Sequence, residues 1–278
     1  MQTVSRRQFL ERSAAGVAVG VTAGGVGVCT LQAQDWARQA VDKSPRKREW
    51  VSVKHDGRSV ESFIAHPESR AKAPVMVVIH EIFGMSDWVE SVTDEFAAAG
   101  YLAIAPDLLS GMGPKGGRTK DIPADGVGAV IRTLPPDQIT ADLAAVADYC
   151  AKLPGSNGKV CVVGFSWGGG QSFRFATNRK DLSAAFVFYG SGPEADAIAR
   201  IQAPVYGFYA GTDARINASI PATQQQMKAA GKAYEVVTYE GAAHGFMRAG
   251  AQPDATEPNK KARAEAWVKL KAMREKLA

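Results

Sequence analysis

Four stretches of the chain are almost continuously apolar, and each has the length of a strand. They are APVMVVIH, YLAIAPD, KVCVVGF and AAFVFYG, which begin at positions 73, 101, 159 and 184. A strand of a parallel sheet is covered on both faces, so it shows a continuous apolar run instead of alternation. Two further runs, PVYGFYAG and YEVVTYE, begin at positions 204 and 234. The pattern therefore predicts a parallel sheet of several buried strands.

Segments with helical patterns lie between many of these strands. We expect helices over residues 86–100, 137–152, 221–230 and 259–277. Strands that alternate with helices predict an α/β fold with helices on both faces of the sheet. Ahead of the first buried strand, EWVSVKH and SVESFIAHP flank Asp56-Gly57, which is typical of a β-hairpin turn. The prediction is a mostly parallel, doubly wound sheet with an antiparallel hairpin at its N-terminal edge.

One region interrupts this alternation. Residues 111–136 contain many glycines and prolines, with one short helix expected near residues 127–132. This excursion is too small to form a domain, and the rest of the chain keeps one rhythm with short connections. We therefore expect a single domain over residues 49–278, preceded over residues 34–48 by a polar segment that is a linker or a frayed helix.

The first 33 residues differ from the rest of the chain. SRRQFLERS is followed by AAGVAVGVTAGGVGVC, an uncharged stretch rich in glycine and alanine. The pair Arg6-Arg7 ahead of Phe9-Leu10 resembles a twin-arginine export signal. The apolar part is too short and too weakly hydrophobic for a good membrane span. We expect residues 1–33 to be a signal peptide for the twin-arginine export machinery, leaving no stable membrane span and a periplasmic or secreted protein.

Composition narrows the possible functions. The formal net charge is +5, and Lys and Arg are interleaved with Asp and Glu without a long basic block, so nucleic-acid binding is not expected. The three cysteines, at positions 29, 150 and 161, form neither a disulfide framework nor a zinc-binding spacing. We expect an enzyme that uses no metal and no cofactor.

A motif for a nucleophile follows the strand KVCVVGF. Gly164, Ser166 and Gly168 fit the pattern G-x-S-x-G, in which a sharp strand-to-helix turn projects the serine above the sheet. The flanking glycines are required because the turn packs these positions against neighbouring backbone. The same turn places the Trp167 N–H at the start of a helix, where it can stabilise an oxyanion. The second oxyanion N–H is expected from the loop after the first parallel strand, at Ile82.

A serine nucleophile needs a base, and the base needs a carboxylate that fixes its tautomer. Among the four histidines, only His244 lies late in the chain, just after the last buried strand. Asp213 follows the preceding strand. The order Ser166, Asp213, His244 is that of the α/β-hydrolases. Each residue alone has an ordinary structural explanation, but three in this order, each after its own strand, indicate a catalytic triad.

Several motifs together resemble one family. They are VIHEIFGMSDWVESVTDEFAAAGYLAIAPDLL, the serine turn, GTDARI and GAAHGFMR, and they are similar to those of the dienelactone hydrolase family. The resemblance extends from about residue 49 to residue 277, nearly the whole chain after the expected signal. It implies the α/β-hydrolase fold. Well-known members carry cysteine where this chain has Ser166, so the proton of the nucleophile must here be removed by His244.

The resemblance also implies roles for further residues. The glutamate of HEIFG faces the nucleophile in the family, which puts Glu81 beside Ser166. The family binds its substrate's carboxylate with arginines. Arg248 stands at the position that matches one of them, and either Arg118 or Arg132 is a candidate for the other.

The resulting hypothesis is an exported serine hydrolase that cleaves a small ester or lactone, with or without a carboxylate, through an acyl-enzyme. Two alternatives stay open. A peptidase or acyltransferase could use the same scaffold, and a binding protein without catalysis could retain the fold. An intact triad argues against the second, because a binding protein has no need of all three residues.

Overall fold

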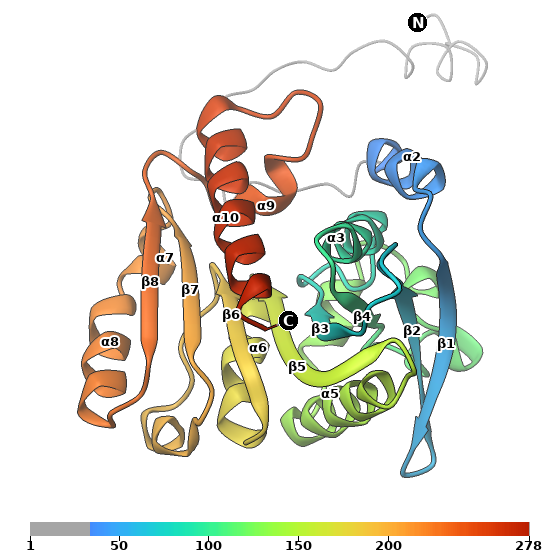
Figure 1. Cartoon of the computed structure of the whole chain (residues 1–278), viewed down its shortest axis with the longest axis horizontal. Coiled ribbons are helices and arrows are strands. Elements are labelled where there is room, and N and C mark those ends of the chain that lie inside the picture. Colours follow the sequence, from blue (N-terminus) through green and yellow to red (C-terminus); the bar gives the residue numbers. More distant parts are fainter. Residues whose placement is uncertain (1–33, 278) are drawn as a thin grey trace, which may run out of the picture. The chain divides into compact units, whose positions relative to one another are not determined.

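The computed structural model describes residues 34–277, and within them the core is an eight-stranded sheet in the order β1-β2-β4-β3-β5-β6-β7-β8 (Figure 1). The strands are β1 (Arg48–His55), β2 (Arg58–Ala65), β3 (Ala73–Ile79), β4 (Leu102–Pro106), β5 (Ser156–Phe165), β6 (Leu182–Phe188), β7 (Val205–Ala210) and β8 (Tyr234–Tyr239). The α-helices are α2 (Asp35–Lys43), α3 (Asp87–Ala98), α4 (Val127–Ile131), α5 (Pro136–Ala151), α6 (Trp167–Asn178), α7 (Ala214–Asn217), α8 (Ile220–Ala229), α9 (Phe246–Ala249) and α10 (Glu257–Glu275). The 3₁₀ turns of this part of the chain are η1 (Pro114–Gly116), η2 (Thr119–Asp121) and η3 (Ala195–Arg200).

The predicted sheet and its hairpin are confirmed. From β4 to β8 all neighbouring strands are parallel, whereas β1 pairs with β2, and β2 with β4, in the antiparallel sense. The hairpin therefore closes one edge of the sheet. Its turn has a positive φ at both Asp56 and Gly57, the conformation that a two-residue hairpin connection requires.

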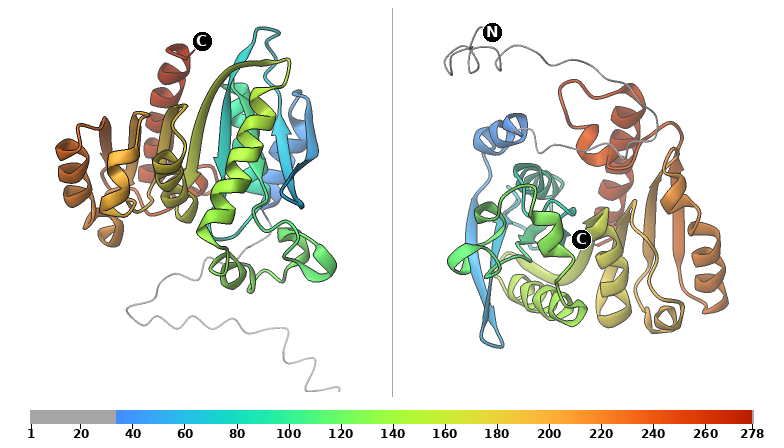
Figure 2. Two further views of the ribbon diagram at one scale, coloured as in Figure 1. Left: turned by 90° about the horizontal axis from the view of Figure 1, so that it is seen from below. Right: turned by 180° about the vertical axis from the view of Figure 1, so that it is seen from behind.

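Helices cover both faces of the sheet, as Figures 1 and 2 show. On one face, buried side chains of α5, α6 and α8 pack against alternate residues of the central strands, such as Val77 and Val162. On the other face, α2, α3 and α10 pack against the intervening residues, such as Val78 and Val163. Because both faces are covered, the central strands are apolar at successive positions. No helix of residues 34–277 is long and apolar enough to span a membrane.

The polar segment before the sheet, expected to be a linker or a frayed helix, contains a helix. Residues 35–43 form α2, which packs on α3. Arg38 donates to Glu90 at 3.0 Å, and in the segment that follows α2, Arg46 donates to Asp94 at 2.6 Å. The polar composition that suggested a linker comes from side chains whose partners lie about fifty positions further along the chain. The expected signal peptide, residues 1–33, lies outside the described residues.

The glycine- and proline-rich excursion is anchored at Asp107, just after β4. The Asp107 carboxylate is 1% exposed and accepts hydrogen bonds from the N–H of Leu109, the N–H of Thr119 and the Thr119 hydroxyl, at 3.1, 3.0 and 2.6 Å. The Thr119 hydroxyl in turn accepts from the N–H of Met85 at 3.2 Å. The excursion is therefore tied to the loop that follows β3, which carries Glu81 and Ile82.

Candidate active site

The serine turn is a tight junction between β5 and α6. Ser166 has φ 55° and ψ −114°, a backbone conformation that is costly for a residue with a side chain. The glycines around it allow close packing. A Cβ on Gly164 would lie 1.8 Å from the carbonyl oxygen of Gly168, and a Cβ on Gly168 would lie 2.3 Å from the carbonyl oxygen of His80. The fold therefore requires both glycines, and it holds Ser166 at the carboxyl end of the sheet.

The structure brings Ser166, His244 and Asp213 into one hydrogen-bonded chain. The Ser166 Oγ lies 2.7 Å from the His244 Nε2, and the His244 Nδ1 lies 2.5 Å from the Asp213 Oδ2. A carboxylate only accepts hydrogen bonds, so the neutral imidazole carries its proton on Nδ1 and presents a lone pair to the serine hydroxyl. The Asp213 side chain is 7% exposed and that of His244 is 36% exposed. The aspartate is thus shielded while the histidine faces solvent.

Neighbouring loops fix the aspartate and the histidine. The second oxygen of Asp213 accepts from the N–H of Ile216 at 3.2 Å and caps α7. Thr212 donates its hydroxyl to the carbonyl of Ala242 at 2.9 Å, which joins the two loops. The buried Asn259 of α10 accepts from the N–H of the residue before the histidine at 2.9 Å. These bonds hold the carboxylate and the imidazole at a constant separation.

Tyr189, at the end of β6, packs directly on the histidine and was missed from the sequence. Its ring centroid is 5.0 Å from that of His244 and 5.2 Å from that of Phe246. Its φ of 39° is unusual for a residue with a side chain, and it is fully buried. Burial raises the pKa of its hydroxyl well above the usual value, so the ring is neutral. The sequence carries no signal for this role, because an aromatic residue at the end of a buried strand is typical of core packing.

His80 and Trp167 lie together where the two oxyanion N–H groups are expected. The fully buried His80 ring stacks on the Trp167 indole, with 5.4 Å between centroids and 13° between planes. Burial lowers the pKa of His80, so the ring is neutral. The Trp167 N–H is the first of α6, a position with no acceptor inside the helix. Ile82 follows β3 by three positions.

Glu81 and Arg248 form a buried ion pair. The Arg248 Nε donates to the Glu81 Oε2 at 2.7 Å, and the two side chains are 13% and 4% exposed. Glu81 borders the histidine loop, since its Oε1 lies 3.7 Å from the position of a Cβ on Gly245. Within the described residues no hydrogen bond joins Glu81 to Ser166. The family resemblance places Glu81 beside the nucleophile. In the structure the Glu81 carboxylate is hydrogen-bonded to Arg248, the arginine that was expected to bind a substrate carboxylate.

The two candidates for a second substrate arginine have other contacts. The Arg118 guanidinium stacks over the Trp50 ring, 3.5 Å from its centroid. Arg132 is exposed and donates to the carbonyl of Gly128 at 3.0 Å. The position of a Cβ on Gly128 is 3.6 Å from both the Arg132 guanidinium and the Ile82 side chain.

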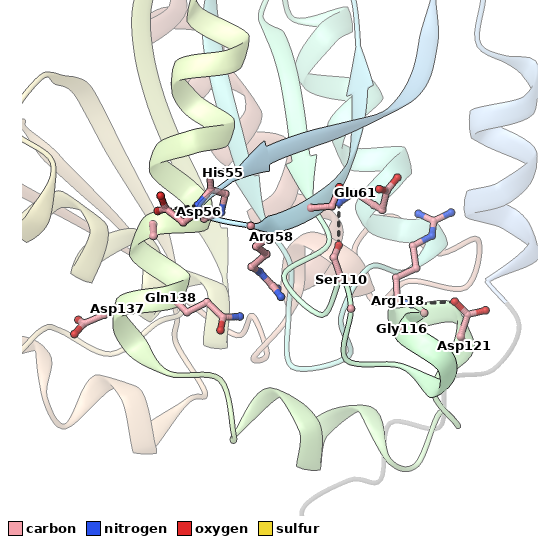
Figure 3. A pocket seen from close by; sticks show the side chains of 15 residues that line it. His55, Asp56, Arg58, Glu61, Ser110, Gly116, Arg118, Asp121, Asp137 and Gln138 are labelled. Atoms are coloured by element: carbon pink, nitrogen blue, oxygen red, sulfur yellow. Dashed lines mark hydrogen bonds and ion pairs between the residues drawn. The ribbon is translucent and has the colours of Figure 1, made fainter.

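A separate polar cleft of about 970 Å³ lies between the hairpin turn, the loop after β4 and the start of α5 (Figure 3). Arg58 and Gln138 point toward its open space. The buried Asp142 accepts from His55 at 2.8 Å and from Arg58 at 3.0 Å, which ties the hairpin to α5. None of the residues in the serine–histidine–aspartate chain lines this cleft. Within residues 34–277 no group of three or more His, Cys, Asp or Glu side chains is arranged to hold a metal ion.

Comparison with known proteins identifies the family. The pattern that defines the dienelactone hydrolase family matches residues 60–276. A Salmonella typhi protein provisionally named carboxymethylenebutenolidase is 32% identical over 208 residues, which cover 70% of this chain and 76% of that protein. A Saccharolobus solfataricus protein with the same provisional name is 29% identical over 255 residues, with 78% and 94% coverage.

A solved structure agrees with these relatives. The crystal structure of a Klebsiella pneumoniae protein, provisionally identified as a dienelactone hydrolase, superimposes with a TM-score of 0.71 at 25% identity. The match covers 82% of this chain and 98% of that one. The chain therefore belongs to the dienelactone hydrolase family of α/β-hydrolases, and it is an ester or lactone hydrolase.

Proposed function

We propose that this enzyme hydrolyses a small ester or lactone through an acyl-enzyme on Ser166. The single observation that carries the proposal is the continuous hydrogen-bonded chain from the Ser166 hydroxyl through His244 to Asp213. A hydroxyl is too weak an acid to ionise at neutral pH, so it attacks only when a base accepts its proton. The 2.7 Å contact with His244 supplies that base directly.

The reaction proceeds in two halves. The Ser166 Oγ bonds to the carbonyl carbon while its proton moves to the His244 Nε2, and the carbonyl oxygen becomes an oxyanion. His244 then gives the proton to the leaving oxygen, and the bond between that oxygen and the carbonyl carbon breaks. In the second half His244 takes a proton from a water molecule while the water oxygen bonds to the acyl carbon. His244 then gives the proton to the Ser166 Oγ as the bond between Oγ and that carbon breaks, which releases the acid. Asp213 stabilises the imidazolium in both halves without accepting its proton, and the N–H groups of Trp167 and Ile82 hold the oxyanion.

Two separate alanine variants test this proposal, one at the nucleophile and one at a control serine. Ser166→Ala should lower kcat for 4-nitrophenyl acetate by about 10³-fold or more, because the covalent step is lost. Ser69→Ala is the matched control, since Ser69 is an exposed serine in the loop before β3. Its rate should equal that of the unmodified enzyme. Turnover by Ser166→Ala at the control's rate would refute the mechanism.

The substrate is proposed to carry a carboxylate, which Arg248 binds. A guanidinium can grip a carboxylate through two parallel hydrogen bonds. Arg248 is already paired with Glu81, so a substrate carboxylate has to compete with Glu81 or share the guanidinium with it. The pair is nearly neutral as a whole, and it therefore attracts an anion less strongly than a single arginine would.

Two substitutions separate substrate binding from a structural role of Arg248. Arg248→Ala should weaken transition-state binding of an anionic ester by roughly 2–5 kcal/mol, as calculated from the ratio of kcat/KM values. The loss for the neutral analogue should be much smaller. Glu81→Gln removes the competing charge, so it should raise the preference for the anionic ester. If both variants change the two substrates equally, Arg248 is structural and the proposed carboxylate is wrong.

A second groove, of about 510 Å³, runs from Trp167 along α6. Ser166, Asp213 and His244 are not among the residues that line it. We therefore assign no part of the substrate to this groove.

Export by the twin-arginine route remains part of the proposal. It is supported by the sequence alone, through Arg6-Arg7 ahead of Phe9-Leu10 and the weakly apolar stretch that follows. Changing both arginines to lysine should keep unprocessed protein in the cytoplasm, as measured by fractionation and immunoblotting. Unchanged processing of that variant would exclude this route.

A further inference from the structure

His80 occupies a position that links both expected oxyanion donors. Its ring stacks on the Trp167 indole, and its backbone carbonyl lies against Gly168, where a Cβ would come within 2.3 Å. Its Nδ1 lies 2.9 Å from the carbonyl oxygen of Glu81. A single buried side chain therefore contacts the start of α6 on one side and the loop after β3 on the other.

The contact with the Glu81 carbonyl has a geometric consequence. The described residues contain no cis peptide bond, and in a trans peptide the C=O and the N–H of one plane point in opposite directions. The carbonyl of Glu81 and the N–H of Ile82 belong to the same peptide plane. Whatever fixes the direction of this carbonyl therefore also fixes the direction of the Ile82 N–H.

Two donors hold that carbonyl. The N–H of Gly84 donates to it at 3.1 Å, and the His80 Nδ1 donates at 2.9 Å. A carbonyl oxygen has two lone pairs and can accept both bonds. The position of Gly84 is itself fixed. It has φ 69°, and Thr119 fills the space that a Cβ would need, with its nearest atom 2.6 Å from the Cβ position. The peptide between Glu81 and Ile82 is thus fixed from both ends of a short turn.

We propose that His80 is a positioning residue that locks the Glu81–Ile82 peptide, so that the Ile82 N–H is aimed at the developing oxyanion. This inference rests on the proposed acyl-enzyme mechanism. A hydrogen-bond donor lowers the barrier only if it is already oriented before the oxyanion forms. Without the His80 bond, the peptide keeps one of its two anchors and can rotate, which turns the N–H away.

The His80 side chain is suited to this task and to no proton transfer in the reaction. It is fully buried, and its Nε2 has no hydrogen-bond partner in the described part of the chain. Burial lowers its pKa, because the charged form would lose hydration. The ring therefore stays neutral with its proton on Nδ1, the nitrogen that faces the carbonyl.

Two substitutions separate the hydrogen bond from the ring. His80→Phe keeps a ring that can stack on Trp167 but has no donor. His80→Asn loses the ring but carries an amide nitrogen where the imidazole Nδ1 was, two bonds beyond Cβ. We expect His80→Phe to lower kcat for 4-nitrophenyl acetate by about 10- to 100-fold, somewhat less than removal of a whole oxyanion donor. KM of His80→Phe should stay within about twofold, because the oxyanion interaction is made only in the transition state. His80→Asn should recover most of kcat, because it restores a donor to the Glu81 carbonyl.

A second measurement reports on the oxyanion itself. Sulfur accepts hydrogen bonds weakly, so a thionoester gains less than the matching oxygen ester from oriented N–H groups. The ratio of ester to thionoester turnover should therefore fall in His80→Phe and return in His80→Asn. Both variants are measured in the full chain, with kcat per folded active site counted by fluorophosphonate titration, so partial misfolding does not mimic the effect.

The outcomes decide the inference. Loss in His80→Phe with recovery in His80→Asn supports it. Wild-type rates and ratios in His80→Phe overturn it, and so does equal loss in both variants, because the donor that His80→Asn restores would then recover nothing. If Ser166→Ala retains activity, the acyl-enzyme mechanism fails first, and that result is independent of the His80 variants.

Discussion

Gly168 offers a direct test of how closely β3 and α6 must approach at the serine turn. A Cβ on Gly168 would lie 2.3 Å from the carbonyl oxygen of His80 and 2.5 Å from that of Ile79. Both contacts are with backbone, so no side chain can rotate away. In Gly168→Ala, the start of α6 must move from β3 by several tenths of an ångström to about 1 Å, because ordinary Cβ contacts begin near 3.4 Å.

The expected loss of stability in Gly168→Ala is the difference between an unfavourable and a favourable effect. Overpacking costs about 1–3 kcal/mol or more, and alanine returns up to about 1 kcal/mol of helix propensity. A net loss of about 2 kcal/mol should lower Tm by about 4–8 °C in a chain of this size. The shift also separates the Trp167 N–H from the Ile82 loop. A displacement of about 1 Å in an active site can cost about 100-fold in rate, so kcat should fall by about that factor.

Gly170→Ala is the matched control in the same helix. Its Cβ would lie 3.3 Å from the Ser191 Oγ, an exposed side chain that can rotate. Its Tm should be equal or slightly higher, and its kcat should stay within about twofold, since only helix propensity changes. Thermal denaturation and 4-nitrophenyl acetate turnover measure both variants. If Gly168→Ala matches Gly170→Ala in both assays, the close approach is not required and our account of the turn is wrong.

Two further predictions concern the histidine's partner and the buried thiols. Asp213→Asn should lower kcat by about 10³- to 10⁴-fold, because the amide favours the wrong His244 tautomer. Tm should be nearly unchanged, because the amide oxygen still caps α7. A loss of kcat below tenfold would contradict this. Cys150 and Cys161 are fully buried, and burial raises the pKa of Cys161 to about 12 and that of Cys150 further. In a Cys29→Ser background, neither should react with Ellman's reagent at pH 8 until denaturant is added. Rapid labelling of that native variant would show that the core opens.

The strands and the three residues of the hydrogen-bonded chain could be predicted because their signals are local. Each of Ser166, Asp213 and His244 follows its own apolar strand. The carboxyl ends of parallel strands share one edge of a sheet, so the order in the chain was sufficient to bring the three together. The glycines around Ser166 are equally local, since a single turn imposes them.

The remaining features depend on partners far away in the sequence. Glu81 and Arg248 are 167 positions apart, and no periodic pattern indicates that they pair. The charges of α2 look like a solvated linker until α3 is placed beside them. Tyr189 looks like ordinary core until its positive φ and its contact with the histidine are known.

The proposed mechanism requires Ser166 to form the covalent intermediate. Treatment with a fluorophosphonate, followed by intact-mass spectrometry and peptide mapping, identifies the residue that reacts. We predict one adduct per chain, on Ser166, formed rapidly in the unmodified enzyme and about 10³-fold or more slowly in His244→Ala, since the attacking hydroxyl then lacks its base. An adduct on another residue, or ester hydrolysis that persists after Ser166 is fully modified, would contradict the claim.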